Sequence, residues 1–149
     1  MGKTMVQICR ATLQHLDRIV PLFDAYRQFY GRNSDLDGAR AFLTARIKGD
    51  ESVILLAADG AGFAQLYPCF SSVRMRKTLI LNDLFVAPEA RCQGVGAALL
   101  DAACVHARSV GAAKMSLSTA VDNSAAHALY VRAGWERDAQ FHTYTIGVD

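Results

Sequence analysis

The chain has few cysteines, and their spacing does not suit a metal. The four cysteines of its 149 residues form no Cys-x-x-Cys motif and have no paired histidines nearby, which argues against a zinc site; they are Cys9, Cys69, Cys92 and Cys104. The first residues also lack the continuous apolar segment of a secretory signal. We therefore expect reduced thiols, no bound metal and a cytoplasmic location.

Long hydrophobic runs and a concentrated charge of one sign are missing as well. No run reaches the ~18 apolar residues that cross a bilayer, so the sequence predicts no contact with a membrane. The net charge is only +2, and the basic residues are scattered apart from Arg74, Arg76 and Lys77, which argues against a nucleic-acid partner. Hydrophobic residues make up 52% of the chain, so a folded core is expected, in a single domain over residues 1–149.

The hydrophobic periodicity changes several times along the chain and predicts a mixed fold. Helical spacing predicts helices at about residues 12–30, 36–48, 94–110 and 124–133, with Thr12 as an N-cap and Pro21 as a kink or break. Short apolar or alternating runs predict strands at residues 6–10, 52–58, 62–70, 78–86, 114–119 and 141–148. Antiparallel strands followed by a strand–helix–strand unit indicate an α+β sheet with helices on both faces.

A glycine-containing turn between the strand at 78–86 and the helix at 94–110 is the most informative segment. The first turn of a helix has backbone N–H groups without internal partners and carries the positive end of the helix dipole. Glycines let a ligand approach that backbone, and an arginine adds a full positive charge. The turn therefore predicts a phosphate or diphosphate site formed by Arg91, Cys92, Gln93, Gly94, Val95, Gly96 and Ala97.

The spacing within this turn excludes two phosphate-binding motifs. A P-loop ends in Gly-Lys-Ser/Thr, whereas Gly96 is followed by Ala97. A dinucleotide fingerprint needs a small residue where this chain has Leu99, and an acid at the end of the next strand, which is missing here.

The remaining pattern, Arg-x-x-Gly-x-Gly, resembles the acetyl-CoA diphosphate loop of the GNAT superfamily of N-acetyltransferases. Downstream, residues 122–138 are similar to the last helix of that family, with Asn123, Ala126 (or Ala125), Tyr130, Gly134 and Trp135 at the matching positions. The specific part of the resemblance covers about residues 79–138. Cys92 departs from the family pattern, since glycine or a basic residue is usual there, but a thiol does not block binding by the backbone.

The resemblance implies a fold and a donor substrate. The implied fold is a mixed, mostly antiparallel sheet of about six to seven strands, with a splayed central parallel pair and about four helices. The implied donor is acetyl-CoA, whose pantetheine arm would pair with the backbone of Leu84, Phe85 and Val86 as an added strand does. Asn123 and Ala126 would complete the binding site, and Asn123 also suits the N-cap of its helix.

Two residues are candidates for the chemistry. The resemblance places Tyr130 near the cofactor sulfur, where a phenol with a pKa near 10 stays protonated and can donate to the departing thiolate; packing in the core is the alternative. Asp83 lies beside the expected thioester. A free aspartate, with a pKa of ~3.9, is a weak base for an ammonium, but it could act through water, orient a cationic amine or have a structural role. Strand alternation places the Asn82 side chain on the opposite face.

Together these patterns predict an enzyme that transfers acetyl from acetyl-CoA to a small primary amine by direct attack. A protein or peptide amine as acceptor, and a non-catalytic acyl-CoA-binding module, remain alternatives. The resemblance also implies a homodimer. Aromatic residues are weak candidates for an acceptor pocket, with core packing as the other interpretation of most of them: Tyr26, Phe29, Tyr30, Tyr67 and Phe70. The sequence does not name the acceptor, because such pockets are built from loops and early helices.

Overall fold

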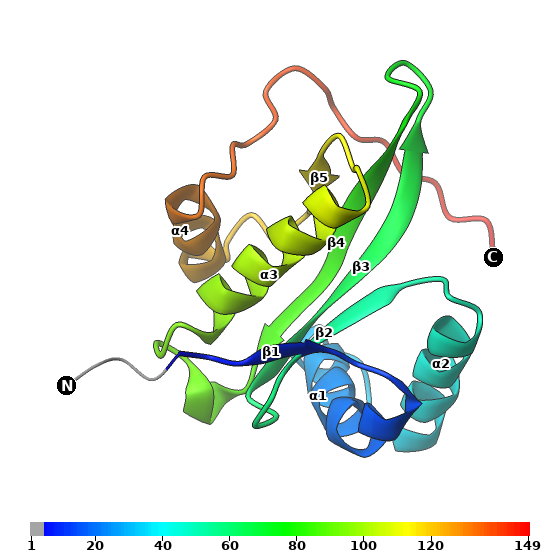
Figure 1. The fold of residues 1–149 in the computed structure, drawn as a ribbon, viewed down its shortest axis with the longest axis vertical. Coiled ribbons are helices and arrows are strands. Elements are labelled where there is room, and N and C mark those ends of the chain that lie inside the picture. Colours follow the sequence, from blue (N-terminus) through cyan, green and yellow to red (C-terminus); the bar gives the residue numbers. More distant parts are fainter. Residues whose placement is uncertain (1–4) are drawn as a thin grey trace. The chain divides into compact units, whose positions relative to one another are not determined.

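The computed structural model describes residues 5–149, which form two compact units. The first unit extends through Ser118 and holds a five-stranded sheet with helices α1, α2 and α3 (Figure 1). The second unit, Thr119–Asp149, holds helix α4 (Ser124–Arg132). Each unit is described below by itself. In the described part of the chain, no helix is long and apolar enough to span a membrane.

The sheet of the first unit is mixed, as predicted. Its strands follow one another in space as they do in sequence: β1 (Ile8–Arg10), β2 (Val53–Ala57), β3 (Gly62–Ser71), β4 (Arg76–Val86) and β5 (Met115–Ser116). The first four strands are antiparallel neighbours, and β4 and β5 are parallel. The prediction of six to seven strands is wrong, because the described residues form five.

The predicted strand at residues 141–148 is the one that does not form. The apolar side chains of this segment are between 77% and 91% exposed; they are Phe141, Tyr144, Ile146 and Val148. Alternation predicts a strand only if another strand satisfies its backbone groups, and the second unit contains no other strand over its described residues. As a result β5 is the edge of the sheet, so the predicted parallel pair is present but is not central.

The parallel pair is also short, which leaves one side of β4 open. β5 has only two residues, where the sequence predicted six, and they pair with Leu79 and Ile80. From Leu81 to Val86, β4 continues along β3 but has no strand beside it on its other edge among the described residues. This open backbone edge lies in the segment where the sequence predicted cofactor binding.

Helices α1 (Leu16–Phe29) and α2 (Leu36–Lys48) cover one face of the sheet. Thr12 caps the short 3-10 turn before α1, as predicted, and α1 runs through the exposed Pro21 without a break. The core on this face joins both helices to alternate residues of three strands; its strand members are Ile54, Leu56, Phe63 and Phe85.

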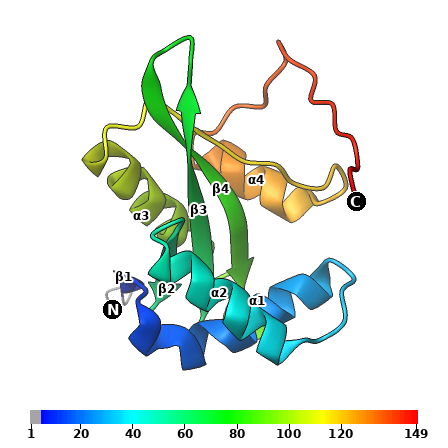
Figure 2. The same ribbon diagram turned by 90° about the vertical axis from the view of Figure 1, so that its right-hand side faces the viewer.

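Helix α3 (Val95–Ser109) packs on the other face (Figure 2). Leu99, Leu100 and Ala103 of this helix are buried, as are the alternate strand residues Ala64 and Leu66. The two cores confirm helices on both faces, and they assign each side chain of β3 and β4 to the α1/α2 face or the α3 face.

Candidate active site

A β-bulge interrupts β4 at Asn82. Gln65 lies opposite Asp83 and Leu66 lies opposite Leu81, so Asn82 is the extra residue. The Asn82 side-chain amide donates a hydrogen bond to Oδ1 of Asp83 at 2.9 Å. The two side chains therefore lie together, and the prediction that they point to opposite faces is wrong, because the bulge breaks the alternation on which it depended.

Past the bulge, backbone groups of two residues face the open edge of β4. The amide of Ala87 donates to the carbonyl of Ala61 at 2.8 Å, which makes these opposite residues a hydrogen-bonded pair. Since such pairs alternate along an antiparallel ladder, Leu84 and Val86 turn their amides and carbonyls away from β3. The backbone groups of Phe85 turn toward β3. Of the three residues predicted to pair with pantetheine, only Leu84 and Val86 turn their backbone groups toward this edge.

Arg91 joins the glycine-containing loop to the end of that edge. Its Nε donates to the carbonyl of Val86 at 3.1 Å, and its guanidinium lies 5.8 Å from the centre of the Phe85 ring. The remaining guanidinium N–H groups leave Arg91 able to contact an anion as well. The loop and the strand that were predicted to hold one ligand are therefore connected directly.

The loop leads into α3 with a left-handed turn. Gly94 is the N-cap with φ 82°, and the amide of Ala98 donates to its carbonyl at 3.0 Å. The amides of Val95, Gly96 and Ala97 precede that bond and so have no acceptor within the helix. Three adjacent N–H groups at the positive end of a 15-residue helix suit a diphosphate.

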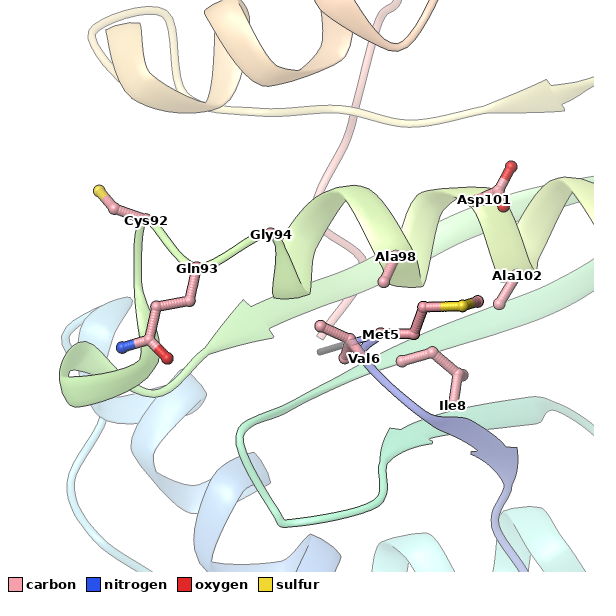
Figure 3. Close-up of a pocket in the computed structure, with 9 residues that line it drawn as sticks. All are labelled: Met5, Val6, Ile8, Cys92, Gln93, Gly94, Ala98, Asp101 and Ala102. Atoms are coloured by element: carbon pink, nitrogen blue, oxygen red, sulfur yellow. The ribbon is translucent and has the colours of Figure 1, made fainter. Parts of the chain in front are cut away.

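A pocket of about 720 Å³ borders the same loop but lies toward β1 (Figure 3). The side chains of Ala98 and Ala102 point toward Met5, Val6 and Ile8, whereas the sulfur of Cys92 points to the other side of α3. Because β1 and β5 are opposite edges of the sheet, this pocket does not contain the open edge of β4. The pantetheine site predicted on β4 therefore lies outside this pocket, although the predicted diphosphate loop borders it.

The Asp83 carboxylate is hydrogen-bonded to a row of buried polar side chains that the sequence did not predict. Its side chain is 4% exposed, and its Oδ2 accepts a hydrogen bond from Nε2 of Gln65 at 2.5 Å. Oε1 of Gln65 in turn accepts from the hydroxyl of Ser52 at 2.8 Å, and both of these residues are buried. The available signal was a glutamine in the middle of an otherwise apolar strand, where a buried amide needs partners.

Aromatic residues border the bulge on the α1/α2 face. The Tyr26 ring lies 6.2 Å from Phe85 and 5.1 Å from Tyr30, and its hydroxyl donates to the carbonyl of Asn82 at 3.4 Å. Of the other predicted aromatics, Phe29 touches Tyr30 but is largely exposed, and Phe70 is 74% exposed on the β3–β4 hairpin.

Tyr67 also lies on this face, close enough to Asp83 for the carboxylate to disfavour ionisation of the phenol. Burial, and then the Asp83 carboxylate, raise the pKa of Tyr67 to about 12. The phenol therefore stays protonated at neutral pH and can donate a hydrogen bond. The α1/α2 face thus combines a carboxylate, tyrosine rings and a neutral hydroxyl.

The remaining predicted residues belong to the second unit. Asn123 caps α4 by accepting a hydrogen bond from the amide of Ala126 at 3.2 Å, which confirms its predicted capping role. Tyr130 is half-buried, with its ring 6.2 Å from that of Trp135, whose amide donates to the Tyr130 carbonyl. The contacts of Asn123 and Ala126 with the cofactor, and of Tyr130 with its sulfur, stay predictions.

The fold and this site define a class of acyltransferases, and comparison with known proteins gives the family. The model of the acetyltransferase (GNAT) family matches residues 19–135. The chain belongs to the GNAT family and is an N-acetyltransferase. Members of this family generally use acetyl-CoA.

Individual relatives agree with this assignment. The chain is 50% identical over 133 residues to the uncharacterized N-acetyltransferase YhfO of Bacillus subtilis (strain 168), covering 87% of this chain and 89% of YhfO. It is 32% identical over 108 residues to aminoglycoside N(6')-acetyltransferase type 1 of Klebsiella aerogenes, covering 69% and 71% of the two chains. A crystal structure of a probable acetyltransferase superimposes with a TM-score of 0.91 at 45% identity, covering 96% of this chain and 98% of that one.

Proposed function

We propose that this protein transfers an acetyl group from acetyl-CoA to the primary amine of a small molecule. The observation that carries the proposal is that two different sides of β4 offer groups suited to the two substrates. One edge of the strand turns backbone groups of Leu84 and Val86 away from β3, next to the N-terminus of α3, and the α1/α2 face carries the buried carboxylate of Asp83.

The residues of the first unit fit an acyl-CoA. The amides of Val95, Gly96 and Ala97, with the charge of Arg91, suit its diphosphate. The open edge beyond Leu81 suits the amides of its pantetheine arm, which would pair as a short added strand. In the second unit, Asn123 and Ala126 are assigned to the same substrate by the family resemblance. Cys92 and Gln93 complete the loop.

The acetyl transfer needs three events that these residues can supply. The amine nitrogen forms a bond to the thioester carbonyl carbon, the carbon–sulfur bond breaks, and its electron pair leaves on the sulfur. An ammonium acceptor gives up two protons in all: one passes to solvent before attack, and one balances the proton that Tyr130 gives to the thiolate. Asp83 accepts and orients the ammonium, and positioning of this kind can contribute several kcal/mol.

The acceptor side favours a small cationic amine. A carboxylate bordered by tyrosine rings suits an aliphatic ammonium through charge and cation–π contacts. The Klebsiella relative is named for an aminoglycoside acceptor, which is consistent with a small molecule.

Calorimetry with acetyl-CoA, followed by a thiol-release assay over a panel of amines, tests the proposal. We expect binding of acetyl-CoA and release of coenzyme A with small primary amines. Turnover with peptide amines only would move the acceptor to that class, and binding without turnover on any amine would indicate a regulatory module.

Tyr130→Phe tests the assigned general acid. This variant should bind acetyl-CoA normally and lose about 10²–10⁴ of kcat, because the thiolate then leaves without a proton donor. Tyr144→Phe makes the same chemical change at a side chain that is 89% exposed and should keep full activity. Equal turnover in the two variants would remove Tyr130 from the mechanism.

A further inference from the structure

Two buried carboxylates of the first unit differ in how they are satisfied. Asp24 is 4% exposed and accepts three hydrogen bonds, from the hydroxyl of Ser34, the amide of Asp35 and the side chain of Gln28. The charge of Arg27 also favours its ionised form. The hydrogen bonds and the positive charge that stabilise the Asp24 carboxylate thus all come from the protein itself.

Asp83 is equally buried but accepts fewer hydrogen bonds and has no ion-pair partner among the described residues. Its two hydrogen bonds come from neutral amides, those of Gln65 and Asn82. None of the ion pairs found among residues 5–149 includes Asp83. Arg46, whose charge reaches the neighbouring Tyr67, is paired with Glu51 at 3.2 Å. A buried carboxylate without a cation is costly unless a ligand supplies the charge.

The arrangement leaves this carboxylate able to accept more. Each carboxylate oxygen can accept two hydrogen bonds, and each oxygen of Asp83 has one from the protein. Asn82, whose amide contacts Oδ1, is an exposed residue, whereas Asp83 itself is buried. Tyr26 contacts the same bulge, because its hydroxyl donates a hydrogen bond to the Asn82 carbonyl.

We propose that Gln65, fixed by Ser52, is a positioning residue that holds the Asp83 carboxylate ready for the ammonium group of a cationic amine acceptor. The proposal rests on the proposed function in taking an amine as the acceptor. It goes further by assigning the selection of a charged amine to a buried three-residue chain that starts on the far side of β3.

The direction of the hydrogen bonds from Ser52 through Gln65 follows from the last group, the Asp83 carboxylate. An ionised carboxylate only accepts, so Gln65 must turn its NH₂ group toward Asp83. The Gln65 carbonyl then faces Ser52 and needs a donor, which the Ser52 hydroxyl supplies. Removing that hydroxyl would leave the Gln65 carbonyl unsatisfied and let the amide rotate, which would bring an acceptor against the Asp83 carboxylate.

Binding of two matched probes tests the proposal without any need for turnover. 2-Phenylethylamine carries an ammonium at neutral pH, and 2-phenylethanol has the same skeleton with a neutral hydroxyl. Calorimetry on the full chain measures both. We expect the unaltered protein to prefer the amine by about ten- to a hundred-fold, the range of hydrogen bonds to charged groups. Gln65→Met should reduce that preference to within about two-fold, while the Kd for acetyl-CoA stays unchanged.

Two controls separate positioning from general damage. Gln14→Met makes the same change at an exposed glutamine and should keep the preference. Ser52→Ala should lose much of the preference, whereas Ser52→Thr, which retains the hydroxyl, should keep it. This serine pair decides the question if Gln65→Met fails to fold.

Two results would overturn the proposal: an unaltered protein that binds both probes equally, or a preference that survives in both Gln65→Met and Ser52→Ala. Its failure is distinct from failure of the proposed function. A protein that prefers the amine but releases no thiol with any amine would refute only the acetyl transfer. One that acetylates amines without the preference would refute only the role of Gln65.

Discussion

Gly62 is the first residue of β3 and lies opposite Val86 of β4, and replacing it with alanine should affect folding and acetyl-CoA binding together. A Cβ added to Gly62 would lie 2.6 Å from the carbonyl oxygen of Phe85 and 3.3 Å from both Cα of Val86 and Cγ1 of Val95. The first of these is closer than real Cβ contacts, and it involves backbone that the β3–β4 ladder holds in place. Overpacking of this kind costs about 1–3 kcal/mol. In a chain of this size that should lower Tm by about 3–10 °C.

The assay combines thermal unfolding with acetyl-CoA calorimetry, and Gly60→Ala is the matched control. Gly60 has φ +77° but nothing within 4 Å of an added Cβ, so its substitution should introduce backbone strain of about 1–2 kcal/mol without displacing β4. Only Gly62→Ala should also weaken acetyl-CoA binding, because only that Cβ pushes on the segment from Phe85 to Val95. A Gly62→Ala protein with unchanged Tm and affinity, or a Gly60→Ala protein that loses affinity equally, would refute the reasoning.

Two further substitutions test local features of the first unit. Cys92 has φ 62°, a left-handed conformation that costs a non-glycine residue about 1–2 kcal/mol, partly offset by the chain entropy of glycine, so Cys92→Gly should raise the free energy of unfolding in urea by up to about 1 kcal/mol and keep acetyl-CoA binding. Hydrogen bonds from Ser34 and Asp35 lower the pKa of Asp24, so its contribution to stability is present above the unfolded pKa of ~3.9 and is lost as pH falls through the folded value. Asp24→Asn should therefore be less stable at neutral pH by about 2 kcal/mol and show a flatter acid unfolding profile; parallel profiles for the two proteins would contradict this.

Local signals predicted most of the helices and strands because they depend on near neighbours. Thr12 caps its turn as predicted, and Gly111 and Gly134 follow α3 and α4 with positive φ. Residues 141–148 failed because alternation describes one strand, whereas a strand exists only with a partner. β5 shortened for the same reason, since most of the predicted segment at 114–119 lies beside no paired strand.

The loop was predictable from sequence, but the setting of Asp83 was not. Backbone amides at a helix N-terminus follow from chain order, so a phosphate-binding role could be predicted for Arg91 and Gly94, and it stays a prediction. The partners Ser52 and Gln65 lie 31 and 18 residues before Asp83 and reach it only through the register of β2, β3 and β4. No periodicity specifies such a contact. The contact of Tyr26 with the Asn82 carbonyl depends in the same way on how α1 crosses the sheet.

The bulge at Asn82 decides on which face the carboxylate lies. Leu81, before the bulge, lies opposite Leu66 and shares the α3 face, whereas Phe85, after it, belongs to the α1/α2 core. In an uninterrupted strand, residues 81, 83 and 85 would share one face, so either Asp83 and Phe85 would both lie beneath α3, or Leu81 would leave the α3 face. One extra residue therefore places a charged group among the aromatics of α1 while both halves of β4 keep their apolar contacts. That explains why a strand crossing two cores can carry a buried aspartate, and why the change of face coincides with the start of the open edge.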